Sequence, residues 1–307
     1  MRSVTVGVAQ ATPALFDCEA TVQRVVEWIS RAAEAGCELL LFPESFIPVY
    51  PRGLRYDAVV GRRSDESRRQ WLDYWQQSVT ADDPRLAPVQ DAIRRAGLYV
   101  ALGVTERELR GGSLYCSLFY YDRQGQLLGR HRKLKPTGLE RYLWGEGDPA
   151  GIRSYATDLG EVGGLICWEN YMPLARLSQY QQGVEIYLAP TADARASWQS
   201  TLQHIALEGR CYVLAANQYV RKQDYPDRYQ AQLAEEPEVM SPGGSAIYSP
   251  LGEMLAGPLW QEEGLLTATL DPDVLAMSKL DFDAVGHYAR WEVWDFGEKE
   301  NDRNSPV

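Results

Sequence analysis

The amino-acid sequence predicts an α/β fold in which two related half-sheets pack face to face under helices. Two observations predict the alternation: short apolar runs of strand length recur along the chain, and the segments between them carry apolar residues at helical spacing. A third observation predicts the two half-sheets: residues 121–129 and 248–256 both give a strand, a glycine turn, a polar residue and a leucine-containing strand. Because β-α units precede each hairpin, we expect one sheet against the other.

The first 44 residues predict a β-α-β unit. Residues 4–10 alternate like a strand, and residues 20–35 place apolar side chains on one helical face before Gly36, a natural C-terminal stop. The apolar run 38–44 ends in a charge. Such continuous runs suit strands that helices bury on both faces.

The same alternation continues to residue 270. We expect helices at 67–79, 84–96, 173–182 and 196–209. We expect further strands at 99–105, 113–122, 126–131, 162–167, 184–189, 211–218, 243–249, 253–256 and 265–270. Residues 221–242 are polar, lack periodicity and contain prolines, so we expect a long surface loop near the site. Residues from 297 onward are polar and predict disorder.

The composition is that of an acidic globular protein. The 307 residues are 45% hydrophobic and 24% charged, which excludes global disorder, collagen-like repeats and a coiled coil. The 31 basic and 42 acidic residues leave a formal net charge of −11, so the surface repels phosphate groups. The densest basic run, 130–135, lies between predicted strands. We therefore expect no nucleic acid and no membrane as partner.

The cysteines and the N-terminus indicate a cellular compartment. The five cysteines are widely spaced and form no CxxC pair, which argues against a disulfide framework and a zinc site. The chain begins with a strand pattern rather than a signal peptide, and no apolar run approaches the roughly 18 residues needed to span a bilayer. We expect a cytoplasmic protein.

Three ionisable residues, Glu44, Lys133 and Cys167, stand at the ends of predicted strands. Ligands of open α/β sheets gather at the carboxyl ends of strands, so these groups could meet in one pocket. A cysteine thiolate is a strong nucleophile, and a carboxylate can take its proton and later activate water. A lysine ammonium can stabilise the negative charge that develops on the attacked atom.

Each of these residues also has an ordinary structural explanation. Most buried cysteines are inert, a glutamate after a strand is often a helix cap, and a lysine in a basic run is usually exposed. Spacing alone therefore leaves the active-site interpretation open. The three histidines, His131, His204 and His287, offer few candidates for a Cys–His pair.

The sequence around the three residues resembles the signature segments of the nitrilase superfamily, the carbon–nitrogen hydrolases. The matching segments are LFPE at 41–44, HRKLKPT at 131–137 and GLICWENYMP at 164–173. Further similar segments extend the resemblance from residue 4 to about 290: 142–148, 189–193, 204–210 and 285–290. The order Cys-Trp-Glu-Asn is similar to the true nitrilase branch rather than to the amidase branches.

The resemblance implies roles for individual residues. Glu44 resembles the general base, Lys133 the catalytic lysine and Cys167 the nucleophile. Glu140 resembles a second glutamate that positions the others, although a salt bridge to Arg141 or to another neighbour is its structural alternative. The backbone N–H of Trp168 resembles the second oxyanion donor, beside the lysine.

Other residues are candidates for the pocket wall. They are Trp168, Tyr142, Trp144, Thr191, Ala192 and Asp193, with the segment from Tyr50 as a further contributor. Aromatic residues are also common in cores, which is the alternative for them. Lys135 lies two residues beyond Lys133 and is the alternative lysine, but the matched segment favours Lys133.

The resemblance implies a four-layer αββα sandwich of two face-packed mixed β-sheets covered by helices. We expect residues 1–290 to form a single carbon–nitrogen hydrolase domain, followed by a short C-terminal tail at 291–307. The family implies a homodimer or a larger homo-oligomer. The tail is shorter than in many members of the family, so spirals or filaments are left open. Two further departures are Trp291, where the family commonly has a proline, and residues 148–150, which replace a more usual glycine-containing stretch at an expected subunit contact.

The implied function is that of a nitrilase acting on a small-molecule nitrile and water. Cys167 would add to the nitrile carbon to give a thioimidate, and hydrolysis through a thioester would give the carboxylic acid and ammonia. No metal or organic cofactor is implied. The alternatives are a cyanide dihydratase, an amide or carbamoyl hydrolase of the same superfamily, and a non-catalytic assembly protein. The class of nitrile and the acid-to-amide ratio stay open at this stage.

Overall fold

The first β-sheet pairs the first strand of the chain with the last. The computed structural model describes residues 2–293 and orders six strands as β13-β1-β2-β3-β4-β5. They are β1 (Val4–Gln10), β2 (Leu39–Leu41), β3 (Tyr99–Arg107), β4 (Leu114–Tyr121), β5 (Leu127–Arg132) and β13 (Gly264–Leu270). β2 runs parallel to β1 and β3, and the other neighbours are antiparallel. The sheet is therefore mixed, with parallel strands at its centre.

The second β-sheet has the same mixed character. Its order is β10-β11-β9-β8-β7-β6, and β12 pairs with β11. The strands are β6 (Tyr155–Thr157), β7 (Gly160–Gly164), β8 (Ile186–Leu188), β9 (Tyr212–Ala215), β10 (Tyr219–Arg221), β11 (Val239–Tyr248) and β12 (Met254–Trp260). β7, β8 and β9 are parallel, so their carboxyl ends lie at one edge, as do those of β2 and β3 in the first sheet.

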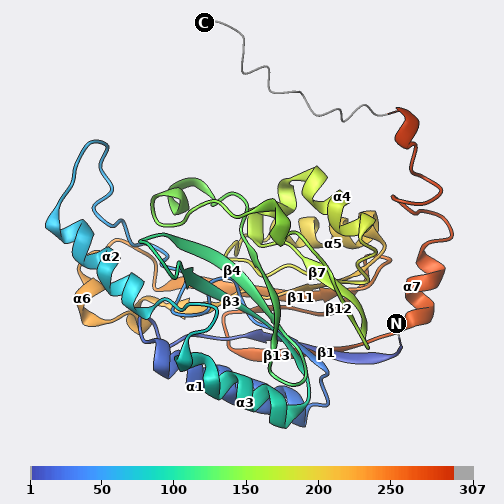
Figure 1. The fold of residues 1–307 in the computed structure, drawn as a ribbon, viewed down its shortest axis with the longest axis horizontal. Helices are drawn as coiled ribbons and strands as arrows, with labels where there is room; N and C mark the ends of the chain where they lie inside the picture. The colour runs from blue at the N-terminus through green and yellow to red at the C-terminus, as the bar shows by residue number, and fades with distance from the viewer. Residues whose placement is uncertain (1, 294–307) are drawn as a thin grey trace, which may run out of the picture.

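Helices cover the outer face of each sheet. α1 (Cys18–Glu34) and α3 (Ala87–Ala96) lie on the first sheet, and α4 (Pro173–Gln181) and α5 (Trp198–Gly209) lie on the second (Figure 1). The remaining α-helices are α2 (Asp65–Gln77), α6 (Asp227–Gln230) and α7 (Pro272–Ser278). The expected four-layer αββα sandwich is confirmed.

Three apolar clusters fill the spaces between the four layers. The cluster between the sheets joins buried residues of both, among them Val6, Leu118, Ile186 and Leu214. A second cluster packs α1 and α3 against the first sheet, and a third packs α4 and α5 against the second. Each fully buried aliphatic side chain contributes about 1.5–3 kcal/mol, so these layers supply most of the driving force for the fold.

The expectation of a long surface loop over 221–242 is only partly correct, because most of the stretch lies at the surface but parts of it are regular and buried. This stretch contains α6 and the start of β11, and four of its apolar side chains are buried: Tyr225, Tyr229, Leu233 and Met240. Tyr229 packs against Phe16, with 4.5 Å between the ring centroids. The spacing of the buried side chains in 221–242 is hard to see in the sequence, because only about one residue in four of this stretch faces the core and the others are mainly polar.

Two further expectations concern the ends of the chain and membranes. The predicted disordered segment from 297 lies outside the described residues, as does most of the tail predicted at 291–307. Within residues 2–293, no helix combines the length and the apolar character that crossing a bilayer requires.

Candidate active site

Glu44 lies just beyond the carboxyl end of β2, where the chain makes a close approach to β3. The Phe46 amide donates to the Gly103 carbonyl at 2.8 Å. A Cβ at Gly103 would lie 2.0 Å from the Pro43 carbonyl oxygen, so only glycine fits at this point of β3. Gln218 fixes the other side, because its Nε2 donates to the Glu44 carbonyl at 2.9 Å. The backbone of Glu44 is thus held by both sheets.

The two carboxylate oxygens of Glu44 differ in their partners. Oε1 accepts from the Lys133 Nζ at 2.6 Å and from the Cys116 thiol at 3.4 Å. Oε2 is buried and has no hydrogen-bond partner. Burial raises the pKa of Glu44; the Lys133 ammonium acts against this rise, and the Glu140 carboxylate adds to it. Glu44 therefore carries one free, buried oxygen of increased basicity.

Lys133 directly follows β5, and its ammonium group bridges two carboxylates. Its Nζ donates to Glu44 at 2.6 Å and to Glu140 at 2.8 Å, and the side chain is fully buried. Burial alone would lower the pKa of Lys133, but Glu44 and then Cys167 raise it, and the net result lies well above its ordinary value. Lys133 is therefore a fixed positive charge.

Gly147 holds the backbone of Lys133 in place. The Gly147 amide donates to the Lys133 carbonyl at 2.9 Å, and the Lys133 amide donates to the Cys116 carbonyl at 2.8 Å. A Cβ at Gly147 would lie 2.1 Å from the Arg132 carbonyl oxygen. The lysine segment is therefore pinned between β4 and the chain that follows it.

Glu140 lies on the short 3-10 helix Gly138–Tyr142, and both of its oxygens are occupied. Oε2 accepts from the Lys133 Nζ and, at 2.7 Å, from the Thr137 amide. Oε1 accepts from the Tyr50 hydroxyl at 2.8 Å. The structural alternative, an ion pair with the adjacent Arg141, is not what the structure shows, because Arg141 donates to the Pro136 carbonyl at 3.0 Å.

Cys167 lies beyond the end of β7, as the first residue of the 3-10 helix Cys167–Tyr171. Its φ of 51° is in the left-handed region, which turns the side chain out of the strand direction. The Thr191 hydroxyl donates to Sγ at 3.2 Å. Burial and then the Glu44 carboxylate raise the pKa of Cys167 to about 12, although Lys133 acts against the rise. At neutral pH the resting group is therefore a thiol.

One buried carboxylate, Glu169, connects the segments that carry Lys133 and Cys167. Its Oε1 accepts from the Leu134 amide at 2.6 Å, and its Oε2 accepts from the Ile166 amide at 2.7 Å. The His131 Nε2 lies 3.0 and 2.9 Å from these two oxygens. Glu169 thereby bonds the residue after the lysine and the residue before the cysteine, which come from different sheets.

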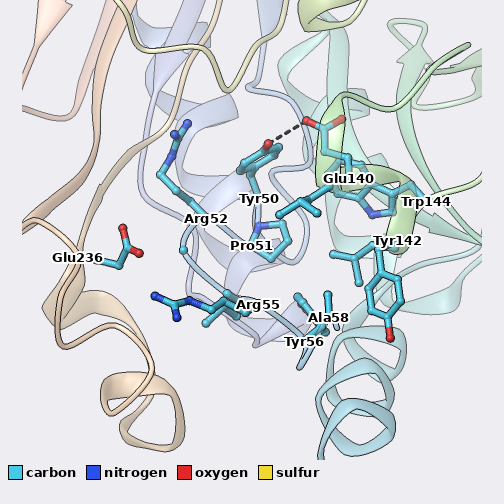
Figure 2. Close-up of a pocket in the computed structure, with 14 residues that line it drawn as sticks. Tyr50, Pro51, Arg52, Arg55, Tyr56, Ala58, Glu140, Tyr142, Trp144 and Glu236 are labelled. Carbon is cyan, nitrogen blue, oxygen red and sulfur yellow. Dashed lines mark hydrogen bonds between the residues drawn. The ribbon is translucent and has the colours of Figure 1, made fainter. Parts of the chain in front are cut away.

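A cavity of about 360 Å³ opens above Cys167. Its walls include Tyr50, Arg52, Glu140, Trp168, Ala192, Asp193 and Met240. The volume is that of a small-molecule site. An adjoining cavity of about 340 Å³ shares Tyr50, Arg52 and Glu140, and Figure 2 shows the Tyr50 hydroxyl pointing at the Glu140 carboxylate.

The residues predicted for the pocket wall divide into two groups. Trp168, Ala192 and Asp193 line the cavity with Cys167, and Thr191 lies below it against Sγ. Tyr142 and Trp144 line the adjoining cavity instead. The Trp168 indole does not cover core, because it is 40% exposed and donates to Asp193 at 2.8 Å. Lys135, the alternative lysine, pairs with Glu146 on the surface.

Sequence reasoning missed three residues of the site, Cys116, His131 and Glu169, and included Arg52 only as part of the segment from Tyr50. His131 and Glu169 lie inside the matched segments, so their presence there was a usable signal. Cys116 carries no such signal, because it occupies an ordinary apolar position of β4. All five cysteines are free and buried. Within residues 2–293, no group of His, Cys, Asp and Glu side chains is arranged to hold a metal ion.

Comparison with known sequences gives relatives that match the whole chain. The aliphatic nitrilase of Sinorhizobium fredii strain HH103 is 42% identical over 308 residues, covering 100% of this chain and 99% of the relative. Nitrilase 1 of Arabidopsis thaliana is 42% identical over 309 residues, covering 99% of this chain and 89% of the relative. The bifunctional nitrilase/nitrile hydratase NIT4B of Nicotiana tabacum is 42% identical and covers 95% of this chain and 84% of the relative.

Comparison with solved structures supports the fold. Nit3 of Saccharomyces cerevisiae, a member of branch 10 of the nitrilase superfamily, has a TM-score of 0.74 at 17% identity, covering 94% of this chain and 97% of that one. A mutant amidase from Nesterenkonia sp. AN1 in complex with butyramide has a TM-score of 0.66 at 20% identity, covering 91% and 95%. The carbon–nitrogen hydrolase family model matches residues 5–279. With its αββα sandwich and full-length relatives, this chain belongs to the carbon–nitrogen hydrolase family, within the nitrilase superfamily.

Proposed function

We propose that this chain is a nitrilase, which hydrolyses an organic nitrile to the carboxylic acid and ammonia. One observation carries the proposal: the Cys167 thiol lines a cavity, and the Glu44 carboxylate and the Lys133 ammonium, which are bonded to each other and buried behind it, both act on that thiol. The full-length relatives named as nitrilases support the same reaction.

The first step forms a bond between the Cys167 sulfur and the nitrile carbon. Because the pKa of Cys167 is about 12, the thiol needs a base, and we assign that role to the unbonded Oε2 of Glu44, whose pKa is raised and whose charge acts on the thiol. One carbon–nitrogen π bond becomes a lone pair on nitrogen, which receives this proton and gives a thioimidate. Lys133 and the backbone N–H of Trp168 hold the charge that develops on nitrogen.

Two water molecules complete the reaction. Glu44 takes a proton from the first water as its oxygen adds to the thioimidate carbon, and the proton passes to nitrogen. The hydroxyl proton then passes to the NH₂ nitrogen as the carbon–nitrogen bond breaks, so that ammonia leaves and the thioester carbonyl forms. Attack by the second water breaks the carbon–sulfur bond and releases the carboxylic acid and the Cys167 thiol. In this scheme Glu140 positions Lys133 and takes no proton, since both of its oxygens are occupied.

A second product, the amide, has a specific observation in its favour. Four relatives at 41–42% identity are named bifunctional nitrilase/nitrile hydratase. The tetrahedral intermediate carries both a carbon–nitrogen and a carbon–sulfur bond, and loss of the Cys167 sulfur in place of ammonia would release the amide. The same groups would also act on cyanide, or on an amide or carbamoyl carbon, so these substrates belong in the test.

We extend the proposal to organisation and assembly. Residues 1–290 form a single domain, followed by the tail at 291–307. The chain forms a homodimer or larger homo-oligomer. Apolar side chains that stay exposed at α4 and α5 support this proposal, among them Met172, Leu174 and Leu207. Five free thiols suit the reducing cytoplasm.

The test is release of ammonia from a panel of nitriles, cyanide and matched amides. We expect ammonia from nitriles in the wild type and none above background in Cys167→Ala. Cys211→Ala is the matched control, because Cys211 is equally buried but lies under α5 and β9. Release of ammonia from amides or from cyanide, with none from the nitriles, would assign the chain to another branch of the family. Full activity in Cys167→Ala would contradict the assignment of Cys167 as the nucleophile.

A further inference from the structure

We propose that Arg52 binds a carboxylate of the substrate, so that the preferred nitrile is an aliphatic one with a carboxylate at the far end. This inference rests on the proposed nitrile hydrolysis and adds a substrate class to it. It is carried by the position of the guanidinium, by its lack of an acidic partner and by the chemistry of the surrounding wall.

Arg52 reaches the cavity that contains Cys167 from the segment after β2, and its side chain is held in place. Its Nη2 donates to the Ala192 carbonyl, and the guanidinium lies over the Tyr50 ring, 5.4 Å from the centroid. The Tyr225 hydroxyl donates to the Arg52 carbonyl at 2.8 Å. A ligand would therefore meet a guanidinium that is already ordered, so little further rotamer entropy would be lost on binding.

The charge of Arg52 has no acidic partner among residues 2–293. Its Nε is buried and makes no hydrogen bond. Glu236 lies beside Arg52 and Arg55 in the adjoining cavity (Figure 2) but forms no ion pair with either. The other arginine on the wall, Arg195, is paired with Asp193. A guanidinium that lines a cavity without an acidic partner is costly to desolvate, which points to an anionic group that a ligand supplies.

The carboxylates of the catalytic centre do not supply that group. Glu140 is saturated by Lys133, Thr137 and Tyr50. The free Oε2 of Glu44 is also unbonded to Arg52. The planar fork of a guanidinium matches a carboxylate, which makes an acid group the fitting ligand.

The remaining wall indicates what separates this carboxylate from the nitrile. The wall of the cavity that Cys167 and Arg52 share includes apolar surface from Trp168, Ala192, Met240 and Pro242, and two of its charged side chains, Asp193 and Arg195, are paired with each other. Such a wall favours a hydrocarbon spacer. The predicted substrate thus places its nitrile at Cys167, its methylene groups on this wall and its carboxylate at Arg52.

The experiment compares ω-cyanocarboxylates with uncharged nitriles of the same length, such as 3-cyanopropanoate with butyronitrile and 4-cyanobutanoate with pentanenitrile. We expect a higher kcat/KM for the acid of at least one pair in the wild type. Arg52→Gln lowers kcat/KM for that acid about 10- to 100-fold, as expected for the loss of a charge-assisted hydrogen bond, and changes the neutral partner less than about threefold. Arg52→Lys restores part of the preference. Arg55→Gln, which changes a neighbouring arginine outside this cavity, leaves both substrates unaffected.

The outcomes distinguish a failure of the Arg52 inference from a failure of the proposed nitrilase function. Equal losses on acid and neutral nitriles in Arg52→Gln would assign Arg52 a structural role through Ala192 and overturn the inference. Turnover of neutral nitriles with no preference for any acid would also overturn it, while leaving the nitrilase function intact. Calorimetric binding of 3-cyanopropanoate to Cys167→Ala, lost in the double variant with Arg52→Gln, would support the site even if no nitrile is hydrolysed, and that result would contradict only the proposed function.

Discussion

At the scale of single residues, the two glutamates of the site are distinguished by how many bonds their oxygens already make. Both Glu140 oxygens are occupied, whereas the Glu44 Oε2 is free. A general base needs an accessible lone pair, so Glu44 alone can exchange a proton with the thiol or with water. The positions of the two glutamates in the sequence do not reveal which of them has a free oxygen. It arises because Tyr50 and Thr137, which are far apart in the sequence, both donate to Glu140.

The raised pKa of Glu44 predicts the acid limb of the pH–rate profile. The base is active when ionised, so kcat/KM falls as the pH drops through this pKa, which lies above the ordinary glutamate value of about 4.3. The Glu140 charge contributes to the rise, so Glu140→Gln shifts the limb to lower pH while reducing the maximal rate. Measuring kcat/KM and kcat from pH 4 to 8 gives the position of the acid limb and the maximal rate. An acid limb that does not move in Glu140→Gln would contradict the effect of the Glu140 charge on the pKa of Glu44.

Cys116 predicts a shift in the opposite direction. Its thiol donates to the Glu44 Oε1, which favours the ionised carboxylate and lowers its pKa. Cys116→Ala removes that bond, so we expect the acid limb to move to higher pH while nitrile turnover is retained. The same kinetic series tests this, with Cys37→Ala, a buried cysteine under α1, as the control. Loss of all turnover in folded Cys116→Ala would point to a different nucleophile.

At the scale of elements, Glu169 joins the end of β5 to the end of β7 and predicts a defect in positioning. Glu169→Gln keeps the shape but places an NH₂ group against one of two backbone N–H donors, those of Leu134 and Ile166. We expect kcat to fall about 10- to 100-fold with KM nearly unchanged, because Lys133 and Cys167 lose their relative placement, and small misplacements of this kind are costly.

The matched control for this prediction is Glu106→Gln. Glu106 is equally buried and accepts from Ser117 and Arg132, but it does not contact the cysteine segment. Breaking either buried network costs about 3 kcal/mol of stability, so thermal unfolding should be similar in the two variants. A kcat that falls as far in Glu106→Gln as in Glu169→Gln would mean that the effect is merely structural.

The elements also show which parts of the fold can be predicted from sequence. The long apolar strands and the helices α1, α3, α4 and α5 lie within a few residues of their predicted bounds, whereas α7 and β6 have no predicted counterpart. The start of α1 has a local cause, because the Asp17 side chain accepts from the Ala20 amide at 2.9 Å. The 3-10 helix carrying Cys167 was not predicted, because its φ of 51° is imposed by tertiary contacts. α6 was missed for the same reason, since Tyr225 and Tyr229 become apolar anchors only once Phe16 lies beneath them.

At the scale of the whole molecule, the pairing of β1 with β13 predicts where the chain can be shortened. β13 pairs with β1 from Val4↔Leu270 to Gln10↔Gly264, and Leu270 is fully buried in the core between the sheets. A chain ending at residue 263 leaves β1 as an exposed edge and opens that core, so we expect insoluble protein or loss of cooperative unfolding. A chain ending at residue 290 keeps every strand found within residues 2–293 and the three apolar clusters described above. Its thermal midpoint should therefore stay within about 4 °C of that of the full chain, the shift expected for about 1 kcal/mol. Circular dichroism melts of the two truncated chains measure their thermal midpoints. A large fall in the midpoint of the chain ending at residue 290 would mean that residues beyond 290 belong to the folding unit rather than to a tail.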